Sequence, residues 1–160
     1  MTDTFSAFER FVRNAKHVRE RDVPEPAEVH PFDERNIHPD IAAVSQKLFD
    51  DGHYSQATFE AFKLIDKTVQ AVSGVVDTGF KLMMTAFSEN GPKIQLNDLV
   101  TMSDKDEQLG FRHMFAGAMS AIRNPRGHEK RTDPIELCLD HLSVASVLLR
   151  TLESRRLPKP

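Results

Sequence analysis

Residues 54–72, YSQATFEAFKLIDKTVQAV, carry an apolar surface that is too wide for a helix with a single buried face. Apolar residues recur in this stretch at the three- and four-residue spacing of an α-helix. One stripe consists of Tyr54, Ala57, Ala61, Leu64, Ile65, Thr68 and Val72, and a second stripe beside it consists of Phe62, Val69 and Val76. Two adjacent stripes predict a helix that packs on two sides at the centre of a helical bundle.

The segments on either side continue the helical pattern and are separated by residues that end helices. Gly52 and Gly74 bound the central stretch. Pro125 disfavours helical geometry at Asn124, so the fourth helix is expected to end there. Besides the central helix, the expected helices span residues 39–52, 76–87, 103 or 104 to 124, and 133–152. The sequence therefore predicts an all-α fold, a compact bundle of about five helices.

The chain is expected to have three parts. Residues 1–37 contain an amphipathic helix from Phe5 to Arg21, followed by a Pro-rich strap that no helix continues through. Residues 38–153 form the helical bundle. Residues 154–160 form a basic tail.

Composition limits the class of protein. Hydrophobic residues make up 39% of the 160 residues and charged residues 28%, which is typical of a soluble globular protein. The single cysteine, Cys138, cannot form an intrachain disulfide, lies between two leucines and is interpreted as core filler. No secretion signal or membrane span is evident, so a cytoplasmic location is expected. The net charge of −3 argues against coating nucleic acid by bulk charge but allows a local basic site.

Such a local basic site is predicted in AIRNPRGHEK, residues 121–130. Between Gly110 and Arg131 the only acid is Glu129. The bases there are Arg112, Arg123, Arg126, Lys130 and Arg131. Pro125 and Gly127 would permit a sharp turn that brings Arg123 and His128 together at the end of the helix.

Arginine and histidine together suit chemistry on phosphate. The planar guanidinium group of arginine matches two phosphate oxygens, and the imidazole of histidine takes and gives protons near neutral pH. Such a pair would cleave RNA without a metal, with the ribose 2′-OH attacking the adjacent phosphorus. One histidine is an incomplete acid–base set, which two copies of the chain in a dimer would complete. The alternative is a polar turn between two helices, in which Arg123 neutralises an acid on a neighbouring helix.

The stretch IRNPRGH resembles the Arg-x4-to-6-His signature of HEPN domains, in which a polar residue, often Asn, follows the arginine. The surrounding sequences HPDIAAVSQKLFDDGHYSQATFEAFKLIDKTV at 38–69 and FRHMFAGAMSAIRNPRGHE at 111–129 are similar to the Ymh-type bacterial family, which is placed in the HEPN group. The resemblance covers roughly residues 38–152.

The resemblance implies a helical bundle, a homodimer and a metal-independent endoribonuclease with a role in toxin–antitoxin or phage-defence systems. The implied catalytic residues are Arg123, Asn124 and His128, and the basic residues expected to bind RNA are Arg112, Arg126, Lys130 and Arg131. Besides RNA and a second copy of the chain, an antitoxin or another defence protein is an expected partner. Many HEPN domains bind RNA or a protein partner without cutting, so a non-catalytic module is the second interpretation.

No metal or cofactor is predicted. His30 and His38, with Asp33 and Asp40 nearby, offer zinc ligands, but the histidines are too far apart on a Pro-rich strap for a compact structural site. The remaining candidates, His53 at the start of the central helix and His141 on the apolar stripe of the last helix, are interpreted as structural residues.

Overall fold

The computed structural model describes Ser6, residues 8–10, Val12, and residues 29–128 and 131–155. The chain divides into two units, Met1–His30 and Pro31–Pro160. In the first unit, Ser6, residues 8–10 and Val12 are helical. The rest of the predicted N-terminal helix, Lys130 and most of the predicted tail lie outside the described residues.

The second unit is built from α-helices. Their bounds are α2 Pro31–Glu34, α3 Pro39–Asp50, α4 Tyr54–Ser73, α5 Gly79–Ala86, α6 Met102–Ala118, a π-helical segment Met119–Arg123, α7 Asn124–His128 and α8 Ile135–Glu153. No strand occurs among the described residues. The predicted all-α fold is confirmed. In the described part of the chain, no helix combines the length and the apolar character needed to span a membrane.

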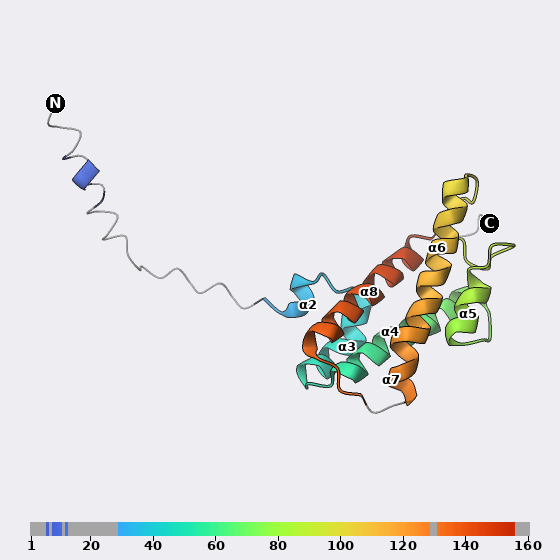
Figure 1. The fold of residues 1–160 in the computed structure, drawn as a ribbon, viewed down its shortest axis with the longest axis horizontal. Coiled ribbons are helices and arrows are strands. Elements are labelled where there is room, and N and C mark those ends of the chain that lie inside the picture. Colours follow the sequence, from blue (N-terminus) through green and yellow to red (C-terminus); the bar gives the residue numbers. More distant parts are fainter. Residues whose placement is uncertain (1–5, 7, 11, 13–28, 129–130, 156–160) are drawn as a thin grey trace. The chain divides into compact units, whose positions relative to one another are not determined.

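Helix α4 lies at the centre of this unit, as its wide apolar surface predicts. It contacts α3, α5, α7, α8 and the π-helical segment. The fully buried side chains of α4 include Ala57, Ala61, Phe62, Ile65 and Val69. Figure 1 shows α6 and α7 as one column, yellow to orange, with the red α8 on one side and the green α5 on the other.

The core also takes in residues that the Pro-rich pattern assigns to the strap. Phe32 of α2 is buried, and its ring centroid lies 5.1 Å from that of Phe49 in α3. Ile37, directly before α3, is buried as well. Burial of an aromatic ring and a branched aliphatic chain anchors this short segment to the bundle.

Two helices begin at residues that differ from the prediction. Helix α5 begins at Gly79, whose N–H donates to the buried Asp66 carboxylate at 2.7 Å, and Val76 lies before the helix with 93% of its surface exposed. Helix α6 begins at Met102 because Thr101 and Asp104 form a reciprocal capping box, one or two residues earlier than the predicted start at Ser103 or Asp104. In both cases a specific polar contact sets the helix start.

The prediction that the fourth helix ends near Asn124 is wrong, because the helical run continues to His128. The N–H of Asn124 donates to the carbonyl of Met119, five residues back, which widens the turn before Pro125. Proline has no N–H to give to the preceding turn. Arg126 Nη1 donates to the neighbouring Ile122 carbonyl oxygen in this turn, at 2.7 Å.

Gly74, which ends α4, provides a test of this boundary. Its φ is +68° and its N–H donates to the Gln70 carbonyl at 2.9 Å. We expect Gly74→Ala to lower the free energy of unfolding by about 1–2 kcal/mol, because a Cβ disfavours the left-handed region. Gly74→Asn should cost less, since asparagine tolerates this region. Urea unfolding measures both, and equal stability of the two variants would contradict the assignment.

Candidate functional site

The predicted catalytic residues and Arg126 lie on one helical run and not around a turn. Arg123 is the last residue of the π-helical segment, and α7 carries Asn124, Arg126 and His128. The predicted sharp turn at Pro125 and Gly127 is therefore wrong. Positions five apart on a helix differ by about 140° around its axis, so the backbone directs Arg123 and His128 toward different faces.

The guanidinium group of Arg123 is held by two neighbours. Its Nη1 donates to Asn124 Oδ1 at 3.1 Å, and its Cζ lies 5.4 Å from the centre of the Phe59 ring of α4. Its Nε is buried and makes no hydrogen bond to any described residue. Because a buried N–H normally has an acceptor, this free donor is suited to an oxygen ligand.

Asn124 contacts Arg123 and lies one helical turn before His128. Asn124 and His128 are four residues apart on α7 and therefore share one face, with about 5–6 Å between their Cβ atoms. The side chain of His128 is exposed. Asn124 therefore shares a helix face with His128 and also accepts a hydrogen bond from the Arg123 guanidinium group.

Gly127 lets this run approach α4 closely. A Cβ on Gly127 would lie 3.0 Å from Cε2 of Phe59, tighter than an ordinary van der Waals contact. The same ring lies against the Arg123 guanidinium group. Phe59 thus supports both the helix and the charged group, a contact that the sequence pattern does not reveal.

Arg126, predicted to bind RNA, is engaged in the interior. Its Nε donates to Asp133 Oδ2 at 2.6 Å, and the two side chains are 2% and 3% exposed. Its Nη2 lies 3.2 Å from His141 Nδ1 of α8, and its Nη1 donates to the Ile122 carbonyl. The interpretation of a basic residue that neutralises a neighbouring acid thus describes Arg126 rather than Arg123.

The other predicted RNA-binding residues are not gathered around Arg123. Arg112 donates to the Met84 carbonyl oxygen at 3.2 Å and pairs with Glu89 at 2.8 Å. It precedes Arg123 by eleven residues, or about 16 Å along a helix. Arg131 is exposed. Lys130 lies outside the described residues.

A cleft of about 340 Å³ lies where Arg126 and Arg131 meet the turn before α4. Its lining residues are Gly52, His53, Tyr54, Ser55, Gln56, Arg126, Arg131, Thr132 and Asp133. The N–H of Asp133 donates to Ser55 Oγ at 3.0 Å, which joins the two sides. His53 is the N-cap of α4, as its predicted structural role suggests, although its side chain makes no capping bond.

Sequence reasoning missed this cleft. The two sides of the cleft are separated by about seventy positions in the chain. In the sequence, only the stretches GHYSQA and NPRGH indicate the two sides. Because the lining combines positive residues with the buried Asp133 carboxylate, the cleft is not purely cationic.

Burial and charge shift two ionisable groups around Arg126. Burial opposes ionisation of Asp133, but the hydrogen bonds from Arg126 and Ser55 outweigh it, and the pKa of Asp133 lies below its ordinary value. Burial and then the Arg126 charge lower the pKa of His141. Cys138, fully buried as predicted, has a pKa raised mainly by burial.

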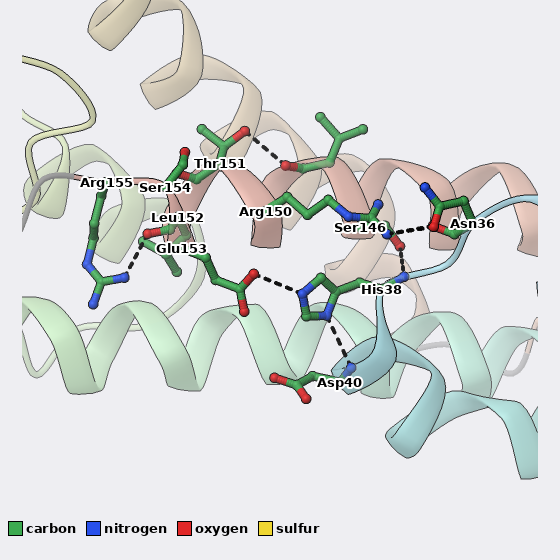
Figure 2. A network of polar contacts seen from close by, with 11 residues as sticks. Asn36, His38, Asp40, Ser146, Arg150, Thr151, Leu152, Glu153, Ser154 and Arg155 are labelled. Atoms are coloured by element: carbon green, nitrogen blue, oxygen red, sulfur yellow. Dashed lines mark hydrogen bonds and ion pairs between the residues drawn. The ribbon is translucent and has the colours of Figure 1, made fainter.

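One set of side chains among the described residues has metal-ligand chemistry: His38, Asp40 and Glu153. His38 Nδ1 accepts a hydrogen bond from the Asp40 N–H at 3.1 Å, and Nε2 lies 2.9 Å from Glu153 Oε2 (Figure 2). Since Nδ1 is the acceptor, Nε2 of the neutral ring carries the proton and donates to Glu153. His38 therefore caps α3 and ties it to α8, and it has no lone pair free for a metal.

Comparison with known proteins identifies one family. The model of the family described as "Protein of unknown function (Hypoth_ymh)" matches residues 35–152. No curated protein and no solved structure matches the chain.

The buried pair of Arg126 and Asp133 gives a test by double substitution. Arg126→Met leaves a buried carboxylate without its cation and should lower the free energy of unfolding by about 3–5 kcal/mol. Adding Asp133→Asn should cost less than the sum of the single losses, with a coupling of about 1–3 kcal/mol. Urea unfolding at neutral pH measures the cycle, and Lys47→Met, which breaks the exposed pair with Asp51, is a control expected to leave the free energy of unfolding nearly unchanged.

The same cycle has a defined pH dependence. Because the pKa of Asp133 is lowered in the folded chain, the coupling should be fully present above the ordinary carboxyl pKa of about 4. It should be lost as the pH falls through the lowered pKa. A coupling that disappears well above pH 4 would assign it to another group.

Proposed function

The chain belongs to the Hypoth_ymh family, and on that premise we propose that it is a metal-independent endoribonuclease of HEPN type with a site shared by two copies of the chain. The observation that carries the proposal is the arrangement of Arg123. Its guanidinium group is held between Phe59 and Asn124 with one buried N–H free, and Asn124 lies one helical turn before the exposed His128.

The proposed chemistry follows from these groups. The imidazole of one His128 takes the proton of the ribose 2′-OH, which attacks the adjacent phosphorus and displaces the 5′-oxygen of the next nucleotide. The imidazole of the second copy donates a proton to that leaving oxygen. Arg123 stabilises the negative charge that develops on the phosphoryl oxygens, and Asn124 orients Arg123. The products are a 2′,3′-cyclic phosphate and a free 5′-hydroxyl.

The shared site requires a contact between copies near α7, and α6 offers a suitable face. Met114 is 49% exposed, and Gly117 and Ala121 follow on the exposed side of the same run. A Cβ added to Gly117 would meet no atom within 4 Å, so another helix could approach closely there. Because α7 continues α6, a two-fold axis beside this face would bring the two copies of His128 near each other.

The proposed setting is a cytoplasmic toxin–antitoxin or phage-defence system. Uncontrolled cleavage of cellular RNA would harm the cell, so the proposed setting includes control by a partner. An antitoxin or another defence protein is the proposed partner, and it would act by covering the exposed His128 or the α6 face.

A second candidate function is a non-catalytic module that binds RNA or a partner protein. The observation that favours it is the engagement of the basic residues: Arg126 is buried with Asp133, and Arg112 pairs with Glu89. Fewer basic side chains are therefore available to contact the phosphate backbone of RNA than the sequence implies. Under this function, Arg123→Ala would weaken salt-dependent RNA binding and no cleavage would occur.

The nuclease proposal predicts cleavage of total RNA by the purified chain in the presence of EDTA. His128→Ala should reduce the rate by about 10²–10⁴-fold, the usual contribution of a general acid–base group. His113→Ala is the matched control, since His113 is also exposed and lies on the same helical run. Circular dichroism should show an unchanged helical content for both variants.

Two results would separate the candidate functions. Wild-type rates for His128→Ala would remove this residue from the chemistry. No cleavage by the wild-type chain, together with RNA binding that Arg123→Ala weakens, would favour the non-catalytic module.

The dimer proposal is tested by introducing a positive charge by substitution on one helix face at a time. Met114 on α6 and Val147 on α8 are both 49% exposed, so Met114→Arg and Val147→Arg are matched substitutions. We expect Met114→Arg to shift the mass in sedimentation equilibrium toward the monomer, because it buries an unpaired charge. Val147→Arg should leave the mass unchanged, and the reverse result would place the contact on α8.

A further inference from the structure

Three parts of the second unit meet at one buried guanidinium group, that of Arg126. Nη1 donates to the Ile122 carbonyl within the helical run, and Nε donates to Asp133 in the connection that leads to α8. Nη2 lies 3.2 Å from Nδ1 of His141, on α8 itself. Each nitrogen of the fork therefore reaches a different part of the chain, which the single ammonium group of lysine cannot reproduce.

These contacts bear directly on the helix that carries the candidate site. Arg126 lies between Asn124 and His128 on α7, and its bond to Ile122 supplies a donor to the turn that precedes Pro125. Besides this guanidinium group, α7 packs on α4, where Gly127 lies close to the Phe59 ring. The position of Asn124 and His128 is thus coupled to the state of Arg126.

The contact with His141 depends on the charge of the imidazole. Arg126 has only donors, so Nδ1 must be an unprotonated acceptor and the neutral ring carries its proton on Nε2. A proton on Nδ1 would remove this acceptor and place two positive charges 3.2 Å apart. Burial and the Arg126 charge lower the pKa of His141, which agrees with a neutral ring in this environment.

The other charged groups around His141 do not reverse this balance. Arg131 adds positive charge from the connection, while Asp133 and Asp140 add negative charge. Asp133 is already paired with Arg126, and Asp140 accepts from Arg35 at 2.6 Å. Cys138, the neighbouring thiol on α8, has a raised pKa and stays uncharged.

We infer that Arg126 is a positioning residue of the candidate site and that it holds α7 only while His141 is uncharged. Where it concerns catalysis, the inference rests on the proposed nuclease function. Acidification protonates His141, weakens the hold of Arg126 on α7 and moves Asn124 and His128 out of register. The cluster of Arg126, Asp133 and His141 thereby makes the candidate site sensitive to pH between neutral and mildly acidic conditions.

The test is amide hydrogen exchange of residues 124–128 in the full chain, expressed as protection factors at about pH 7.5 and about pH 5. The carboxylates stay ionised in this range, so histidine is the residue class that titrates. We expect protection to fall by up to about tenfold for each pH unit below the pKa of the released His141. His141→Asn retains an acceptor near the place of Nδ1 but cannot titrate, so its protection should be independent of pH.

The quantity compared between variants is the slope of the protection factor against pH, because this slope is insensitive to a uniform change in stability. A helix-propensity cost of asparagine changes the level of protection but not its dependence on pH. His128→Ala is the control for the exposed imidazole within α7 and should keep the wild-type slope. Equal slopes for the wild type and His141→Asn would overturn the inference, as would wild-type protection at every pH in Arg126→Lys.

A second readout connects the positioning role to the reaction. If the chain cleaves RNA, the kcat of His141→Asn should fall less steeply than wild type on acidification, while KM changes little in either. If kcat falls equally steeply on acidification in the wild type and in His141→Asn, the positioning role is overturned. If the wild type cleaves nothing but the exchange slopes differ as expected, the nuclease proposal fails and the pH-dependent hold on α7 stands.

Discussion

The buried ion pair of Arg126 and Asp133 is the constraint on which the geometry of the candidate site depends. Two charges removed from water persist only when each satisfies the other with good hydrogen-bond geometry. Here the pair joins α7 to Asp133, two residues before α8, and the remaining nitrogens of the guanidinium group contact the π-helical segment and α8. The core supplies the cohesion of the bundle, and this pair adds a polar contact between α7 and the residues that precede α8.

Much of the fold could be predicted from the sequence, because apolar periodicity records which helix faces are buried. The central place of α4 followed from its two stripes, and its end followed from Gly74. The starts of α5 and α6 were misplaced, since they depend on Asp66 binding the Gly79 N–H and on the Thr101–Asp104 capping box. Polar contacts of this kind have no period, so apolar patterning does not detect them.

The candidate site could be predicted in its residue types but not in its geometry. The sequence identifies Arg123, Asn124 and His128 as a set, and the structure places them on one helical run, where the Asn124 amide contacts Arg123 but no turn brings His128 to it. The sequence predicts Arg126 as a surface residue that binds RNA. Its partners Asp133 and His141 come close to it only in the folded chain. Whether a basic residue is free or buried is a tertiary property that local sequence does not encode. The HEPN relationship and the dimer stay predictions.

The π-helical segment has a consequence for how this chain can vary. A single wide turn at Met119–Arg123 is equivalent to one residue inserted into an α-helix, which rotates everything beyond it by about 100°. Loss of one residue there would restore a regular helix, in which the proline ring of Pro125 would meet the carbonyl group four residues back. It would also rotate α7 about the helix axis and separate Arg126 from Asp133 and His141. The length of this stretch is therefore under stricter constraint than the identity of most of its side chains.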